Sequence, residues 1–153
     1  MANTYTQIHI QIVFTVKGRE NLIAERNREE LQKYITGIIN GEKQKLLAIY
    51  CMPDHIHALI GLRPDISISA LVRKIKSNSS KFINNAKWIK GKFSWQQGYG
   101  AFSYSKNDLP NVIRYINNQP EHHKKKSFRE EYADLLRKFE IEYDAKYLFD
   151  FLD

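Results

Sequence analysis

The feature that most constrains the fold is a strict alternation of apolar residues near the start of the chain. In a predicted strand over residues 4–16, every second residue from residue 8 onward is large and apolar: Ile8, Ile10, Ile12, Phe14 and Val16. Because successive side chains on a strand point to opposite faces, these residues share one face. The strand therefore needs a sheet with a hydrophobic core on one side.

A helix and a hairpin are predicted next. Apolar residues at helical spacing predict a helix over about residues 23–40, which Gly41 closes in the manner of a left-handed cap. Residues 44–52 and 55–62 are predicted to be two strands, and Pro53-Asp54 between them is typical of a tight turn. These strands are expected to pair directly.

One more helix and one more strand complete the predicted sheet. Ser67 or Ser69 can cap a second helix, and residues 98–105 read as a short aromatic strand. The order of elements is then β-α-β-β-α-β. It predicts an α+β, ferredoxin-like fold, in which an antiparallel sheet carries two helices on one face.

Two further helices are predicted after the sheet. Asn107 or Asp108 can cap the first of them, which bears a tyrosine and which Pro120 should end or kink. A tail helix and an acidic, aromatic tail are expected over residues 128–139 and 141–153. The chain shows no linker, so all 153 residues are expected to form a single domain.

Charge and composition narrow the classes of function. The formal net charge of +7 favours an anionic partner, nucleic acid first, although many basic proteins have no such partner. Cys51 is the only cysteine, so neither an intrachain disulfide nor a cysteine-rich zinc site is expected. The start lacks a signal-peptide pattern, and no apolar run reaches about 18 residues. We therefore expect a cytoplasmic, nucleoid-associated protein with no membrane partner.

Two histidines on the third predicted strand form a candidate metal site. His55 and His57 are two residues apart and share a face, whereas the alternate apolar residues belong against the helices. The histidines are then expected on the opposite, open face, where neutral imidazoles can hold one ion. If the first and third strands are neighbours, His9 and Gln11 could lie near them. Ordinary surface histidines would give the same pattern, so both interpretations stay open.

A tyrosine and a glutamine on the third predicted helix form a second candidate group. Tyr115 and Gln119 are four residues apart, so their Cβ atoms should be about 5–6 Å apart on one helix face. A phenoxide can attack phosphorus and leaves more easily than an alkoxide, which suits reversible phosphoryl transfer. The chain has nine tyrosines, most of them expected in the core, so this pair alone carries little information.

Taken together, the motifs resemble those of the single-tyrosine transposases of the HUH nuclease superfamily, both the insertion-sequence type and its repeat-associated relatives. Four stretches carry the resemblance: residues 12–17 (IVFTVK), 52–57 (MPDHIH), 95–103 (WQQGYGAFS) and 112–119 (VIRYINNQ). The sequence His122-His123 follows the last of them. The resemblance spans nearly the whole chain, and the ordered combination is far more specific than any single motif.

The resemblance implies a site and a reaction. His55, His57 and Gln119 would bind a divalent metal, Mg²⁺ or Mn²⁺, and Tyr115 would be the catalytic nucleophile on single-stranded DNA. Two imidazole ligands suit Mn²⁺ better than Mg²⁺. The products would be a 5′-phosphotyrosine and a free 3′-hydroxyl, and a second 3′-hydroxyl would reverse the attack. The family also implies recognition of imperfect hairpins by a homodimer, with the tyrosine helix of one subunit serving the histidines of the other.

Basic and aromatic residues outside these motifs are candidates for DNA contacts. The basic ones follow the first strand, the second helix and the tyrosine helix: Lys17, Arg19, Arg73, Lys74, Lys76, Lys81, Lys124 and Lys125. Phosphate contacts from these groups would make binding dependent on salt. The aromatic ones could stack on unpaired bases: Trp88, Trp95, Tyr99 and Tyr104. Solvated helix faces and core aromatics compete with this interpretation. His122 and His123 are expected to contact phosphates or solvent rather than a metal.

Three other functions stay open. A non-catalytic, ferredoxin-like nucleic-acid-binding protein would bind DNA or RNA without a metal. A metallo-hydrolase acting through activated water would cleave without a covalent intermediate. A replication-initiator nuclease of the same superfamily would be expected to carry further domains.

Overall fold

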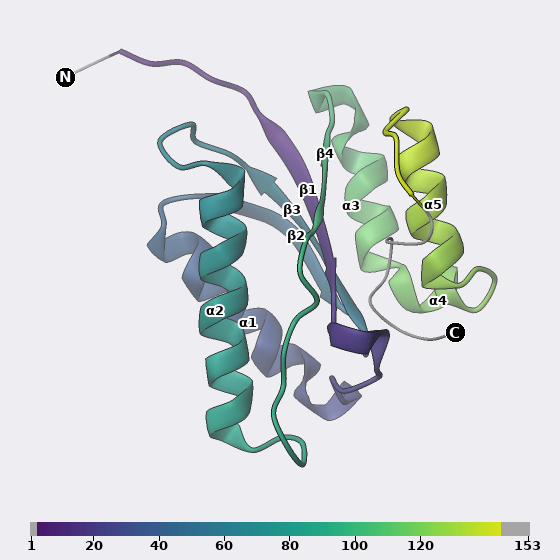
Figure 1. The fold of residues 1–153 in the computed structure, drawn as a ribbon. Helices are drawn as coiled ribbons and strands as arrows, with labels where there is room; N and C mark the ends of the chain where they lie inside the picture. Colours follow the sequence, from purple (N-terminus) through teal and green to yellow (C-terminus); the bar gives the residue numbers. More distant parts are fainter. Residues whose placement is uncertain (1–2, 145–153) are drawn as a thin grey trace.

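Four strands form one antiparallel sheet at the centre of the molecule. The computed structural model describes residues 3–144 (Figure 1). The strands are β1 (His9–Thr15), β2 (Lys45–Cys51), β3 (His55–Gly61) and β4 (Gly100–Ser103). Their order across the sheet is β2-β3-β1-β4, with every neighbouring pair antiparallel. β3 and β1 are therefore the two central strands.

Helices α1 (Glu25–Gly41) and α2 (Ile68–Ala86) lie on one face of this sheet (Figure 1). The apolar faces of β1 and β3 pack against them: Ile12 and Ile56 join Leu31 of α1 in the main hydrophobic core. This arrangement follows from the alternation along the two strands, which leaves no polar side chain toward the helices. The α+β, ferredoxin-like fold predicted from the sequence is confirmed.

Three C-terminal helices lie on the other side of the sheet (Figure 1): α3 (Leu109–Asn117), α4 (Gln119–His123) and α5 (Phe128–Lys138). Two single-turn helices, η1 (Lys17–Arg19) and η2 (Lys106–Asp108), follow β1 and β4. Two smaller apolar clusters attach these C-terminal helices to the sheet. One joins Val13 of β1 to Phe128 of α5, and the other joins Leu59 of β3 to Ile116 of α3.

The packing of α3–α5 on this side of the sheet corrects one expectation. The histidine face of the sheet was expected to be open, but His55 and His57 are 1% and 0% exposed. The alternation along one strand shows which face is polar, but it carries no information about which distant helices pack there. The face is a buried, polar layer between the sheet and α3–α5.

The bounds of the elements differ from the expected ones mainly at the ends. β1 begins at His9 rather than near residue 4, and β4 is confined to Gly100–Ser103. Ser67 is the cap of α2, and its hydroxyl accepts a hydrogen bond from the amide of Ala70 at 3.1 Å. Beyond residue 144, the expected acidic tail lies outside the described residues. Within residues 3–144, no helix combines the length and apolar character needed to cross a membrane.

Candidate functional site

The two histidines sit side by side on a central strand. In the β1–β3 ladder, His55 is opposite Thr15 and His57 is opposite Val13. The two imidazole rings are edge to face, with their centroids 5.1 Å apart. Phe128 of α5 stacks on the His55 ring at 3.9 Å between centroids. The pair is therefore fixed by the sheet from below and by α5 from above.

Hydrogen bonds on Nδ1 orient both rings. His55 Nδ1 lies 2.7 Å from Oδ1 of Asp54, and His57 Nδ1 lies 2.7 Å from Oε1 of Gln11. Both oxygens accept, so each Nδ1 carries a proton, and Nε2 of each ring faces the other side chains of the site. Burial lowers the pKa of His55, and the hydrogen bond with Asp54 opposes this only in part. Neutral rings oriented by a partner on the other nitrogen are the state in which histidine binds metals.

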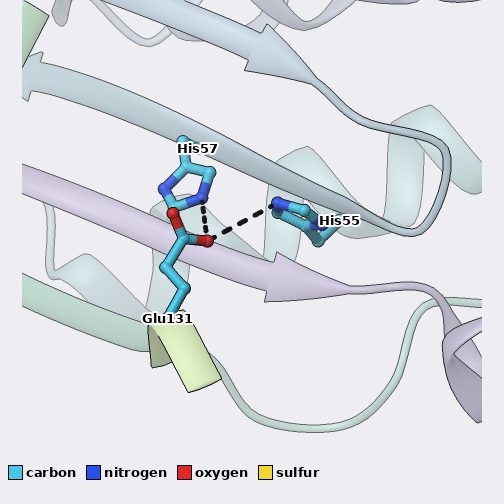
Figure 2. A group of neighbouring side chains, drawn as sticks. All are labelled: His55, His57 and Glu131. Atoms are coloured by element: carbon cyan, nitrogen blue, oxygen red, sulfur yellow. Dashed lines mark hydrogen bonds and ion pairs between the residues drawn. The ribbon is translucent and has the colours of Figure 1, made fainter. Parts of the chain in front are cut away.

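A buried glutamate that the sequence analysis did not single out faces both histidines. Glu131 of α5 is 2% exposed, and its Oε1 lies 3.2 Å from His57 Nε2 and 3.8 Å from His55 Nε2. Figure 2 shows the carboxylate and the two rings pointing toward one another. Burial alone would raise the pKa of Glu131, but hydrogen bonds with His123 and His57 outweigh it and hold the pKa well below its usual range. The group is therefore a buried carboxylate anion.

A sequence signal for Glu131 existed. Phe128, Glu131 and Leu135 are spaced by three and four residues, so all three lie on one face of α5. All three are buried. An ionisable residue on an apolar helix face is costly unless it is paired. That position was therefore a reason to look for a polar partner in the core.

Tyr115 lies beside this cluster, within the same chain. Its hydroxyl donates a hydrogen bond to Oε2 of Glu131, and its ring meets the His57 ring edge to face at 5.7 Å. Burial raises the pKa of the Tyr115 phenol well above its usual range, and the negative charge of Glu131 raises it further. In this state the phenol is neutral, so positive charge nearby would be needed to release its proton.

Gln119 also reaches the cluster, across a break in the helix. α3 ends at Asn117 and α4 begins at Gln119, with Pro120 in its first turn. The fully buried Gln119 amide places its Oε1 3.3 Å from His55 Nε2. Its Nε2 donates a 3.2 Å hydrogen bond to Glu131 Oε2. The break expected near Pro120 thus aims the amide at the histidines.

The two histidines of α4 belong to the same cluster, contrary to expectation. His123 Nε2 lies 3.0 Å from Gln119 Oε1 and 3.2 Å from Glu131 Oε1. His122 Nε2 lies 3.2 Å from Glu131 Oε2, but at an angle unsuited to hydrogen bonding, so among the described residues this buried nitrogen has no hydrogen-bond partner. The turn of α4 directs both rings inward, which a sequence pattern of adjacent histidines does not reveal.

These groups fit a divalent cation. One ligand atom each from His55, His57 and Glu131 lie within 4.8 Å of one another. Two ligands of one ion at about 2.1 Å are about 3 to 4 Å apart, the range measured here between the carboxylate oxygen and the imidazole nitrogens. Two neutral imidazoles, one carboxylate and a neighbouring amide oxygen form a donor set suited to Mn²⁺ or a similar ion.

The predicted DNA-binding residues do not gather at this site. Three parts of the surface carry them: η1 (Lys17, Arg19), α2 (Arg73, Lys74, Lys76, Lys81) and the turn after α4 (Lys124, Lys125). Lys124 and Lys125 directly follow α4, whereas α2 lies across the sheet from α3–α5 (Figure 1). Several ammonium groups already have protein partners. Lys74 forms an ion pair with Glu42 at 2.6 Å, and Lys124 forms one with Glu121 at 3.0 Å. Lys76 Nζ donates a 2.7 Å hydrogen bond to the carbonyl of Gln96.

Most of the predicted stacking aromatics are structural. Trp95 is 8% exposed and packs edge to face on Phe14 at 4.8 Å. Trp88 packs on Phe82, and the Tyr104 hydroxyl accepts a 2.8 Å hydrogen bond from Gln11. Tyr99, at 38% exposed, is the one of the four predicted rings with a large accessible face.

Comparison with known proteins gives one family. Residues 4–119 match the model of the family described as IS200-like transposases. The chain is 25% identical over 130 residues to the transposase for insertion sequence element IS200 of Salmonella typhimurium, covering 81% of this chain and 84% of that protein. It is 22% identical over 118 residues to the ISDra2 transposase TnpA of Deinococcus radiodurans, covering 74% and 84%.

Solved structures show the same fold. A putative transposase from Deinococcus radiodurans superposes with a TM-score of 0.61 at 23% identity, covering 78% of this chain and 96% of that one. A REP-associated tyrosine transposase bound to a REP hairpin superposes with a TM-score of 0.59 at 19% identity, covering 80% and 73%.

Proposed function

The chain belongs to the family of IS200-like transposases, and we propose that it cleaves and rejoins single-stranded DNA through a covalent bond to Tyr115. The observation that carries the proposal is the convergence of Tyr115, His55, His57 and Gln119 around the buried carboxylate of Glu131. These are the four residues that the resemblance had singled out. The histidines lie on β3, Tyr115 lies on α3 and Gln119 lies on α4. The fold therefore brings together side chains that are as far as 64 residues apart in the sequence.

The reaction needs no nucleotide cofactor, because the energy of the phosphodiester is kept in the protein–DNA bond. The Tyr115 oxygen attacks the scissile phosphorus, and the bond from phosphorus to the 3′-oxygen breaks. The phenol gives up one proton and the 3′-oxygen takes one up, so the step is balanced. A phosphotyrosine remains on the 5′ end, and attack by another 3′-hydroxyl reverses the sequence and joins new strands.

The residues proposed to hold a divalent cation, Mg²⁺ or Mn²⁺, are His55, His57 and Gln119. When bound, such an ion supplies positive charge for the oxygens of the scissile phosphate and for the phenol. The chain itself contributes the orientation of the ligands, through Gln11 and Asp54 on the two Nδ1 atoms. It also excludes bulk water from the histidines, which are almost fully buried.

The proposed substrate is single-stranded DNA that contains a hairpin. Two observations support it: the net charge of +7, and the similarity in fold to a transposase bound to a REP hairpin. Lys124 and Lys125 follow α4, the helix next to the one that carries Tyr115, and are proposed to contact phosphates near this tyrosine. The basic residues of η1 and α2 would contact parts of the DNA that lie farther from Tyr115. An extended single strand or a hairpin stem is long enough to reach them.

Whether Tyr115 serves its own chain or a partner is a separate part of the proposal. Within the single chain, the tyrosine already contacts the cluster around His57. A homodimer that exchanged its tyrosine helices would form the same contacts across two subunits. Mixing Tyr115→Phe protein with His57→Ala protein discriminates the two arrangements. Recovered cleavage means action in trans, and no recovery means action in cis.

The test uses hairpin oligonucleotides with randomised flanks, labelled at one end, together with Mn²⁺. DNA labelled at its 3′ end should become bound to the protein in a complex that survives denaturation. DNA labelled at its 5′ end should be released as a shorter strand. Tyr115→Phe should remove the complex, with Tyr5→Phe, at an exposed tyrosine, as a matched control that keeps it. Cleavage that persists in Tyr115→Phe without any covalent complex would instead favour a hydrolase that uses activated water.

A further inference from the structure

We propose that Glu131 links the nucleophile to the cation: its Oε1 is a further ligand of the ion, and its Oε2 holds the hydroxyl of Tyr115. This inference rests on the proposed function and adds a residue to it. It also assigns a role to α5, which lies outside the residues 4–119 that match the family model.

The two oxygens of this carboxylate face different groups. Oε1 lies 3.2 Å from His57 Nε2 and 3.8 Å from His55 Nε2, on the side of the metal-binding nitrogens. Oε2 accepts from the Tyr115 hydroxyl and from Gln119 Nε2. A carboxylate can bind an ion through one oxygen and accept a hydrogen bond through the other. Glu131 is therefore positioned to do both without changing its rotamer.

The charge of the site also calls for this residue. Among the described residues, Glu131 is the carboxylate in the group of His, Cys, Asp and Glu ligand atoms that converge on one point. Imidazole and amide ligands carry no charge of their own, so without Glu131 the ion would have no anionic ligand in this buried site. Mg²⁺ and Mn²⁺ favour anionic oxygen ligands, and Glu131 supplies one that His55, His57 and Gln119 do not.

The local structure holds Glu131 in place. Ser127 begins α5 with a capping box: its hydroxyl accepts from the amide of Glu130, and the Glu130 side chain accepts from the amide of Ser127. One residue farther on, Glu131 points into the sheet with Phe128, which stacks on His55. A cap that fixes the first turn of a helix also fixes the direction of the side chains on that turn.

The first experiment measures Mn²⁺ binding by electron paramagnetic resonance on the full chain, with no DNA present. Glu131→Gln keeps the size of the side chain and removes its charge. Glu30→Gln makes the same change on the exposed face of α1 and is the matched control. Glu131→Gln should bind Mn²⁺ at least about 10-fold more weakly, since even partners that only orient ligands are worth 10- to 100-fold. Glu30→Gln should bind as the wild type does. Equal affinities for the wild type and Glu131→Gln would overturn the proposal.

The second experiment tests the link to the tyrosine. The protein is labelled with ¹³C at the hydroxyl-bearing carbon of tyrosine, and the Tyr115 signal is identified by its loss in Tyr115→Phe. Addition of diamagnetic Mg²⁺ should shift this signal in the wild type and leave it in place in Glu131→Gln. The same shift in both proteins would show that the ion acts on the phenol without Glu131.

A third measurement needs no variant, should Glu131→Gln fail to fold. In a crystal of the wild-type chain grown with Mn²⁺, a Glu131 oxygen should lie about 2.2 Å from the ion. A distance beyond about 3.5 Å would overturn the assignment. Failure of this inference differs from failure of the proposed function: the first leaves the Tyr115–DNA bond intact, and the second leaves Mn²⁺ binding intact.

Discussion

The hydroxyl of Tyr115 donates a hydrogen bond to the Glu131 carboxylate, joining α3 to α5. Because Glu131 also contacts His57, one side chain connects the phenol with the strand that carries the histidines. The position of the Tyr115 hydroxyl therefore depends on how α5 docks on the sheet. Residues far from the chemistry that fix this docking should affect cleavage.

Gly100 is the residue through which this docking can be tested. A Cβ at Gly100 would lie 2.7 Å from the Tyr132 hydroxyl oxygen on α5 and 3.0 Å from a ring carbon of Phe102. Gly100→Ala should therefore push α5 away from β4 and lower the free energy of unfolding by about 1–3 kcal/mol, the usual cost of overpacking. Denaturant unfolding measures this loss, and the yield of DNA–protein complex should fall with it.

Gly37→Ala is the matched control. Gly37 lies inside α1, and a Cβ there would meet no heavy atom within 4 Å. Alanine in a helix interior is favoured over glycine by about 0.5–1 kcal/mol, so this variant should be slightly more stable than the wild type. Equal losses in both variants would contradict the assigned role of Gly100.

The proposed metal site gives a second prediction. His57→Ala removes a proposed ligand, so the DNA–protein complex formed with Mn²⁺ should decrease by more than the 10- to 100-fold typical of outer partners. A chelator should abolish the complex with the wild type. The control is His9→Ala, a half-buried histidine on β1 opposite Gly61, away from the cluster. Full activity in His57→Ala would mean that the cation, if needed, binds elsewhere.

Lys76 gives a prediction about pH. Burial lowers the pKa of Lys76 from 10.5 to about 8, although its Nζ donates to the carbonyls of Gln96 and Gly98. Between these two values the unfolded chain binds a proton that the folded chain does not, so stability from this group rises with pH. The difference in free energy of unfolding between the wild type and Lys76→Met should rise from pH 8 to pH 10. A flat difference would contradict the lowered pKa.

DNA affinity gives the fourth prediction. Lys125 is exposed on the turn that follows α4, whereas Lys74 forms an ion pair with Glu42. Lys125→Ala should weaken binding to single-stranded DNA and reduce the slope of log affinity against log salt by about 0.7. Lys74→Ala should have little effect on either quantity, because its charge is already compensated. The reverse result would place the DNA path along α2.

The sheet could be predicted from the sequence because its pattern is local. The alternation in β1 and β3 shows directly which side chains face α1 and α2, and the turn at Pro53-Asp54 joins β2 to β3. The same alternation places His55 and His57 together on the other face. These conclusions need only the period of a strand and the length of a turn.

The packing of α3 and α5 on that face could not be predicted in the same way. Whether α3 and α5 pack on the histidines depends on contacts between distant residues, such as Val13 with Phe128 and Leu59 with Ile116. The role of Glu131 depends on that packing, because only the docked helix brings the carboxylate to the histidines. The contacts of His122 and His123 with Glu131 could not be predicted for the same reason, because they too depend on how α5 docks.

The proposed bond between Tyr115 and DNA is tested most directly by identifying the residue that carries the DNA. The denatured complex formed with Mn²⁺ is digested with protease and nuclease, and the peptide that keeps a nucleotide is sequenced by mass spectrometry. We expect a nucleotide joined through its 5′-phosphate to Tyr115. Attachment to any other residue, or cleaved DNA with no nucleotide on the protein, would contradict the proposed covalent intermediate.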